Sequence, residues 1–264
     1  MRAQRFLSGA ILPYGRAGSG TVRWLPVPAV PPSSLGPLFA PGPDGPSADG
    51  YGPESPGPHS PRPGTPGEDP LLNLADDCAA CRRCGLAAGR EQVVVSRGDP
   101  RARLMVIGEG PGAQEDSSGL PFVGRAGQLL DQMLASVGID SNRDAYICNV
   151  VKCRPPENRK PKSLEMAACR PWLWRQIAAV DPAVILLTGA SALEGVLGVK
   201  GGISQLRGRW QQGKEEPLLG RWLLPIFHPS YLLRNPSKEP NSPKWLTWHD
   251  LQDVRRRLDA TSAH

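Results

Sequence analysis

Four short apolar runs constrain what this chain can fold into more than any other feature. They cover residues 104–107, 145–151, 183–188 and 223–227. Apolar runs of this length between turn signals are typical of strands that are buried on both faces of a sheet. Helical periodicity is expected at 125–137, 163–179, 190–197 and about 243–258. This alternation predicts an α/β fold in which a parallel sheet lies between helical layers.

Three further segments have less regular patterns. Residues 91–96 are predicted to form a strand and residues 97–100 a turn that leads into the first apolar run. Residues 203–222 are predicted to form a hairpin or irregular β structure. Ser163 is the expected N-cap of the helix that follows it.

A glycine-rich loop follows the first apolar run. Residues 108–112 read GEGPG, and a second loop at 119–124 reads GLPFVG. Neither G-x-G-x-x-G before a helix nor G-x-x-x-x-G-K-[ST] is present, and a loop that carries Glu109, Glu115 and Asp116 would repel phosphate. The pattern therefore favours a neutral ligand or a positioned water.

Polar residues come directly after three of the predicted strands. These residues are Glu109, Asn149 and His228. Because the carboxyl ends of parallel strands meet at one edge of a sheet, where such folds bind ligands, we expect the three side chains to lie close together.

Composition divides the chain near residue 70. Sixteen of the 30 prolines fall in residues 1–70, which have no long apolar periodicity. Such a segment buries too little surface to offset its ordering entropy, so we predict a disordered extension at 1–70 and one globular domain at 71–264. The first 43 residues contain arginine but neither Asp nor Glu. This composition suits an organellar transit peptide, an unstructured bacterial extension or a start codon placed too early.

Charge and hydropathy set broad limits on function. The net charge of +6 permits a polyanionic partner but does not require one, since a solvated basic face has the same effect. No apolar run approaches the length that spans a bilayer, so a membrane location is not expected.

Four of the six cysteines form two spaced pairs. Cys81 and Cys84 are separated by two residues, and Cys153 and Cys169 by fifteen. Four thiolates suit zinc or an iron–sulfur cluster, and spacing alone does not decide between them. Cys78 could replace Cys81 as a ligand. Cys148 lies in an apolar run and is predicted to be a small buried hydrophobe.

The motifs together resemble a known family. The sequences GEGPG at 108–112, GLPFVGRAGQLL at 119–130, NVVKCRPPENRKP at 149–161 and HPSYLLRNP at 228–236 are similar to those of the family 4 uracil-DNA glycosylases of bacteria and archaea. The resemblance covers about residues 75–258. It implies a three-layer α/β/α sandwich with a four-stranded parallel central sheet. It also implies a structural [4Fe-4S] cluster held by Cys81, Cys84, Cys153 and Cys169.

The resemblance also assigns roles in a uracil pocket. Phe122 resembles the aromatic residue that stacks on the flipped base, and Asn149 the amide that reads its Watson–Crick edge. An amide presents a donor and an acceptor that match uracil O4 and N3–H, whereas cytosine presents the opposite pattern. His228 resembles the histidine that contacts uracil O2. Gly108 and Gly110 fall in the backbone of the pocket.

Two acidic residues are the remaining catalytic candidates from the resemblance. Glu109 falls at the motif position that helps to position water or the sugar, and Glu115 resembles a second acidic residue in the pocket. A related family has an aspartate where this chain has Gly110. We therefore expect departure of the base to lead, with weak general-base help.

The enzyme must take the base out of the stack, and residues near the pocket are candidates for DNA contacts. Leu232 and Leu233 are candidates for an apolar wedge. The candidates for phosphate contacts are Arg234, Arg154, Lys152 and Arg125; for each, a solvated surface charge is the alternative. No basic insertion after the second motif is present, so turnover is expected rather than covalent trapping of the base.

The sequence therefore predicts a monomeric uracil-DNA glycosylase that acts on single- or double-stranded DNA and initiates base-excision repair. The expected location is the bacterial cytoplasm, or an organelle if the extension is a transit peptide. The alternatives are a non-catalytic iron–sulfur module that binds nucleic acid and a small zinc protein that acts as a scaffold.

Overall fold

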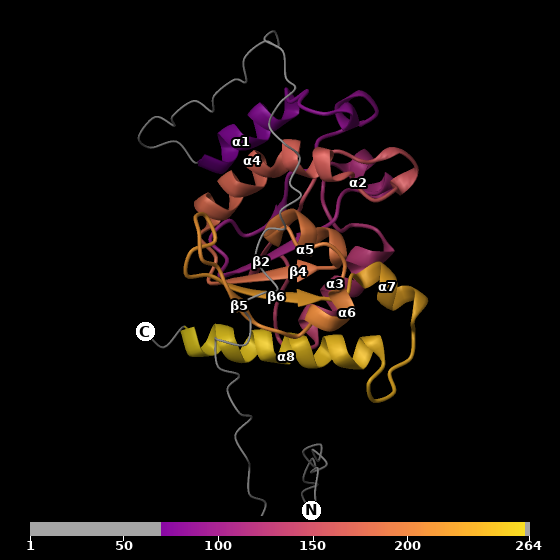
Figure 1. The fold of residues 1–264 in the computed structure, drawn as a ribbon, viewed down its shortest axis with the longest axis vertical. Helices are drawn as coiled ribbons and strands as arrows, with labels where there is room; N and C mark the ends of the chain where they lie inside the picture. Colours follow the sequence, from indigo (N-terminus) through magenta and orange to yellow (C-terminus); the bar gives the residue numbers. More distant parts are fainter. Residues whose placement is uncertain (1–69, 262–264) are drawn as a thin grey trace, which may run out of the picture. The chain divides into compact units, whose positions relative to one another are not determined.

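The computed structural model describes residues 70–261, whose six strands form one sheet in the order β1-β3-β2-β4-β6-β5 (Figure 1). The four central strands are parallel: β2 (Leu104–Gly108), β3 (Ala145–Asn149), β4 (Val184–Thr188) and β6 (Trp222–Ile226). The two-residue strands β1 (Arg97–Gly98) and β5 (Gln211–Gln212) pair antiparallel at the edges. The predicted four-stranded parallel sheet is confirmed as the centre of this larger sheet.

Helices cover both faces of the sheet, as predicted for an α/β/α sandwich. On one side lie α1 (Pro70–Ala79), α4 (Ser163–Val180) and α5 (Ala190–Leu197), and on the other lie α3 (Arg125–Ala135) and α8 (Pro243–Thr261). Strand residues alternate between the two cores: Met105 and Ile107 pack toward α4 and α5, whereas Leu104 and Val106 pack toward α3 and α8. Burial on both faces explains why these strands are continuously apolar.

Several short helices were not predicted. They are η2 (Gly85–Ala88), α2 (Ala113–Ser118), η3 (Pro156–Asn158), α6 (Ile203–Leu206) and α7 (Pro229–Arg234). The predicted hairpin is confirmed only where β5 pairs with β6, because residues 203–206 are helical instead. α1 was also not predicted.

The strand predicted at 91–96 is wrong, because pairing begins only at Arg97, in the segment predicted to be a turn. Val94 N–H donates to Lys152 C=O (2.9 Å), which lies beyond the end of β3. The predicted N-cap is also wrong by one residue. Lys162 is the N-cap of α4, and the Ser163 hydroxyl donates to Glu194 (2.8 Å) instead of capping the helix.

The carboxyl ends of the parallel strands point toward the side where α2, the start of α3 and α7 lie (Figure 1). This edge therefore collects the loops that carry the candidate site residues. The predicted disordered extension lies outside the described residues. Among the described helices, none has the length and hydropathy needed to cross a bilayer.

Candidate functional site

Gly108, at the end of β2, is where two of the predicted ligand-binding side chains converge. A Cβ at residue 108 would lie 2.4 Å from Phe122 Cζ and 2.4 Å from Asn149 Oδ1. The Phe122 ring centroid in turn lies 6.0 Å from that of His228, with the ring planes inclined by 30°. The structure thus brings together the aromatic ring, the amide and the imidazole that the sequence placed in one pocket.

The Phe122 backbone is held in an uncommon conformation. Its φ of +56° lies in the left-handed region, which residues with a Cβ rarely adopt and which is often found at functional sites. Arg97 Nε donates to Pro121 C=O (2.9 Å), and the same guanidinium pairs with Asp131 of α3 (2.6 Å). α3 packs so closely that a Cβ at Gly127 would lie 1.8 Å from Phe122 O. Backbone contacts therefore set where the Phe122 ring lies.

Glu115, predicted to be catalytic, joins the two glycine-rich loops. Its carboxylate accepts hydrogen bonds from the backbone N–H groups of Gly112 (3.1 Å), Val123 (3.0 Å) and Gly124 (2.8 Å). A carboxylate with three main-chain donors has little capacity left to activate water. The observed contacts are those of a positioning residue, and the catalytic role of Glu115 stays a prediction.

Asn149 ends β3 and is 2% exposed. Its main-chain carbonyl accepts a hydrogen bond from Lys152 Nζ (2.6 Å). Within residues 70–261 the hydrogen bond of Asn149 is made by its main-chain oxygen and none is made by its carboxamide, so the amide donor and acceptor are available to a ligand. An asparagine at a strand end can instead use its side chain to satisfy nearby backbone groups, and these contacts do not match that role.

His228 follows β6 and caps the start of α7. Its Nδ1 accepts from Ser230 N–H (3.1 Å) and lies 2.8 Å from Ser230 Oγ. Burial, with a smaller contribution from the cationic Arg234, lowers the pKa of His228 to about 4. The imidazole is therefore neutral at pH 7, and because Nδ1 accepts, Nε2 carries the proton and is the available donor.

Glu109, the other acidic candidate, is partly buried just after β2 and hydrogen-bonded at one oxygen. Ser191 Oγ, in the first turn of α5, donates to Glu109 Oε2 (2.5 Å). Ser191 was missed by sequence reasoning, although it lies three residues after Thr188, the end of β4, and so belongs to the same sheet edge. Gly110 does not approach the uracil-pocket side chains, since a Cβ there would meet Val151 at 2.7 Å.

Five cysteines line one cavity between α1, the loop after β3 and α4. They are Cys78, Cys81, Cys84, Cys153 and Cys169. All four predicted ligands are therefore together, and so is the alternative ligand Cys78, which is 1% exposed. Cys148 is fully buried in β3 and does not line this cavity, which agrees with its prediction as a small core residue.

Basic groups surround the sulfur atoms. Arg90 donates to Cys153 Sγ (3.1 Å) and also to the main-chain carbonyls of Cys81 (3.1 Å) and Ala79 (2.6 Å). Burial raises the pKa of Cys169 to about 11, and the nearby Lys152 opposes this shift. Without a bound group the Cys169 thiol is therefore neutral at pH 7, so a metal centre would have to displace its proton.

The geometry of the cysteines also bears on the type of centre. Across the described part of the chain, no three His, Cys, Asp or Glu side chains are arranged to hold a single metal ion. A single zinc needs its thiolates about 2.3 Å from one point. The side chains that line the cavity include five thiols, the ligand type that zinc and iron–sulfur clusters share.

The predicted DNA-contact residues do not all lie at the surface. Leu232 is 0% exposed, so it packs in the core of the protein and is unsuited to the predicted wedge role; Leu233, its neighbour in α7, is partly exposed. Lys152 is 1% exposed, which corrects its assignment as a phosphate contact.

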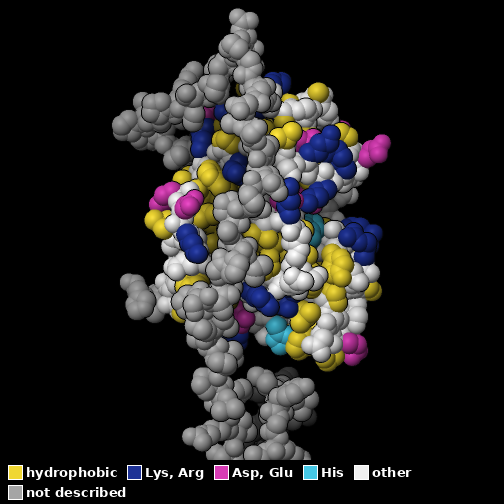
Figure 2. Space-filling view, in the orientation of Figure 1, with side chains coloured by type: hydrophobic (Ala, Val, Ile, Leu, Met, Phe, Trp, Pro, Cys, Tyr) yellow, Lys and Arg dark blue, Asp and Glu magenta, His cyan; other side chains and the backbone are white. Residues whose placement is uncertain are grey.

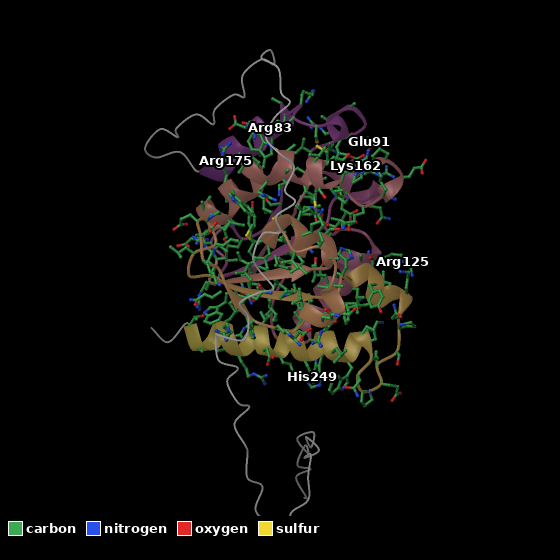
Figure 3. The ribbon with its side chains drawn as sticks, viewed as in Figure 1. Arg83, Glu91, Arg125, Lys162, Arg175 and His249 are labelled. Carbon is green, nitrogen blue, oxygen red and sulfur yellow. The ribbon has the colours of Figure 1, made fainter. Side chains whose placement is uncertain are left out.

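Exposed cations do gather near the site edge. Arg125 and Arg234 are exposed and Arg154 is partly exposed. Figure 3 places Arg125 and Lys162 on the side toward which the strands point, and Figure 2 shows a group of Lys and Arg side chains there. This surface suits a polyanionic ligand.

Comparison with known proteins gives consistent matches. The family model of the uracil DNA glycosylase superfamily matches residues 95–252. A type-4 uracil-DNA glycosylase of Thermotoga maritima is 48% identical over 163 residues, which cover 60% of this chain and 81% of that protein. The type-4 uracil-DNA glycosylase of Archaeoglobus fulgidus is 36% identical (64% and 85% covered), and a type-5 uracil-DNA glycosylase of Thermus thermophilus is 31% identical (57% and 83% covered).

Proposed function

The chain belongs to the uracil-DNA glycosylase superfamily and is a type-4 uracil-DNA glycosylase, and from that premise we propose how its residues carry out the reaction. The reaction hydrolyses the bond between uracil and deoxyribose and leaves an abasic site, which initiates base-excision repair. The observation that carries the proposal is that Phe122 and Asn149 meet beside Gly108 and that the His228 ring lies 6.0 Å from the Phe122 ring.

Recognition of the base depends on two of these side chains. The uracil leaves the DNA stack, because the bond to be cleaved is otherwise inaccessible, and stacks on the Phe122 ring. The Asn149 carboxamide donates to O4 and accepts from N3–H. Cytosine presents a donor and an acceptor in the opposite places, so it leaves both groups of the buried amide unpaired.

Cleavage depends on the neutral His228. As the N-glycosidic bond lengthens, negative charge develops on the uracil and positive charge on the sugar. The His228 Nε2–H group donates to O2, where this negative charge accumulates. A donor that is already in place when charge develops typically contributes about a hundredfold or more in rate.

Completion of the reaction needs a water molecule at the sugar. Glu109 is the proposed residue that positions this water or stabilises the sugar, and Ser191 holds one of its two carboxylate oxygens at 2.5 Å. Glu115 contributes by keeping the Phe122 loop in place through its three main-chain hydrogen bonds.

The cysteine cavity is the proposed site of a [4Fe-4S] cluster, with Cys81, Cys84, Cys153 and Cys169 as ligands. The support is that all four line one cavity and that Arg90 donates to Cys153 Sγ. A bound cluster supplies structural cross-linking of segments far apart in sequence. Iron analysis and the visible absorbance of the purified protein distinguish it from colourless zinc.

Contacts with DNA are proposed for exposed residues around the pocket. Arg125, Arg154 and Arg234 are the candidates for phosphate contacts, and Leu233 is the remaining candidate for the wedge. We expect the protein to act as a monomer. We expect it in the cytoplasm, because the relatives that it matches come from bacteria and archaea. We expect residues 1–70 to be dispensable for uracil release.

The test is release of free uracil from oligonucleotides that contain U:G, U:A or single-stranded U. An oligonucleotide with hypoxanthine and a duplex with thymine in place of uracil serve for comparison. Release of uracil, with no release of thymine from the control duplex, supports the proposal. Binding of the same oligonucleotides without any release would instead favour the non-catalytic module.

A further inference from the structure

Lys152 is among the largest fully buried side chains, with 1% of its surface exposed. It lies between the end of β3 and Cys153, in the loop that connects the two proposed sites. A buried ammonium group destabilises the fold unless other groups compensate its charge. The groups that compensate the charge of Lys152 therefore indicate the role of this residue.

The contacts of Lys152 reach both sites. Its Nζ donates to the main-chain carbonyl of Asn149 (2.6 Å). Lys152 also lines the cysteine cavity together with Cys153, and its positive charge acts on the Cys78 and Cys169 thiols, where it opposes the rise in pKa that burial causes. Within residues 70–261, no Asp or Glu lies within ion-pair distance of Lys152. Carboxylates therefore do not supply its counter-charge, and the acidic groups beside it are the sulfur atoms of Cys78 and Cys169 in the cavity and of the core residue Cys148.

We propose that Lys152 is a positioning residue that joins the two sites. Its ammonium group balances negative charge that the cysteine ligands bring into the cavity, and it holds the main chain of Asn149 so that the uracil-reading amide keeps its place. This inference rests on the proposed function, because it takes the cluster and the role of Asn149 as given.

The arrangement explains why a lysine is suited to this position. Four thiolates around an iron–sulfur cluster carry net negative charge into a site with little access to water, where compensating cations have a large effect. Arg90 supplies one cation through its 3.1 Å contact with Cys153 Sγ, and Lys152 supplies a second from the side of the uracil pocket. An apolar residue would supply neither the charge nor a donor for the Asn149 carbonyl.

The test compares Lys152→Met, Lys152→Gln and Lys152→Arg with the wild type and with Lys214→Met. Lys214 is exposed and outside both sites, so this control removes one lysine charge without touching either. Iron per protein, the reduction potential of the cluster, and kcat and KM for uracil release are measured on each. Wild-type iron content and uracil release are measured first, because failure there refutes the proposed function and not the role of Lys152.

We expect Lys152→Met to hold less iron, to shift the reduction potential to more negative values and to lower kcat about tenfold to a hundredfold with little change in KM. The potential falls because a lost positive charge no longer stabilises the added electron, and kcat falls because the amide is misplaced. Lys152→Arg should keep the potential near that of the wild type, since it keeps the charge.

Two results would overturn the proposal. One is a Lys152→Met protein with wild-type iron content, potential and kcat. The other is a loss of kcat with an unchanged potential, which would leave Lys152 as a support for Asn149 alone. If Lys152→Met does not yield folded protein, Lys152→Gln is judged by the same two results.

Discussion

Replacing Gly108 with alanine tests the geometry of the uracil pocket most directly. The added Cβ would lie 2.4 Å from Phe122 Cζ, 2.6 Å from Phe122 Cε2 and 2.4 Å from Asn149 Oδ1. Carbon atoms in contact are normally about 3.5–4.0 Å apart, so the ring has to move by about 1 Å. The amide has to move as well, because it meets the same methyl group.

The size of the effect follows from this displacement. A misplacement of about 1 Å in a catalytic site can cost about a hundredfold in rate. Overpacking a well-packed site typically costs about 1–3 kcal/mol of stability. For a domain of this size the melting temperature should fall by about 2–12 °C, so the variant remains folded at 25 °C. We therefore expect Gly108→Ala to be folded, to bind DNA and to release uracil about a hundredfold more slowly.

The assay is single-turnover uracil release with enzyme in excess. It is accompanied by a thermal melt and by a measurement of binding to a duplex with thymine in place of uracil. Gly89→Ala is the matched control, because a Cβ at Gly89 would meet nothing within 4 Å and its φ of −109° suits alanine. A Gly108→Ala protein that releases uracil as fast as Gly89→Ala would refute the convergence of the ring and the amide at this point.

Three further predictions concern the same two sites. Asn149→Ala and His228→Ala should each slow single-turnover uracil release about a hundredfold or more while binding to undamaged DNA stays close to normal; near-normal turnover in both would contradict the site assignment. Because burial lowers the pKa of His228 to about 4 from the usual 6.5, the unfolded chain takes up a proton that the folded protein does not, so stability is lost as pH falls from about 6.5 toward 4. Urea unfolding between pH 4 and 7 should show a shallower loss in His228→Ala, and an equal slope would argue against a neutral buried imidazole. Cys153→Ala should yield colourless, poorly folded protein with little iron, and a stable coloured variant would show that the ligand set is wrong.

Much of the fold could be predicted because its signals are local. The four central strands are buried on both faces, and this requirement produces continuous apolar runs that are visible without any partner. The elements that were missed are short: β1 and β5 have two residues each, and α7 has six. Such short elements form because neighbouring parts of the structure pair with them or pack on them, which leaves almost no periodic pattern in the sequence.

The site residues divide in a similar way. The glycine at 108, the aromatic residue at 122 and the cysteine pairs are chemically distinctive at fixed places along the chain, so motif and resemblance identified them together. The sequence alone could not show that the Glu115 carboxylate accepts hydrogen bonds from main-chain N–H groups, because its partners Val123 and Gly124 belong to a different loop.

The amino-acid sequence by itself determined the α/β class, the strand ends that carry polar groups and the set of sulfur ligands to choose from. Only the tertiary structure decided which of the charged and apolar candidates are exposed. Lys152 and Leu232 have the residue types expected of DNA contacts, yet both are buried. The physical reason is that residue type and spacing are properties of the chain, whereas burial and hydrogen-bond partners depend on segments that packing brings together from far apart in the sequence.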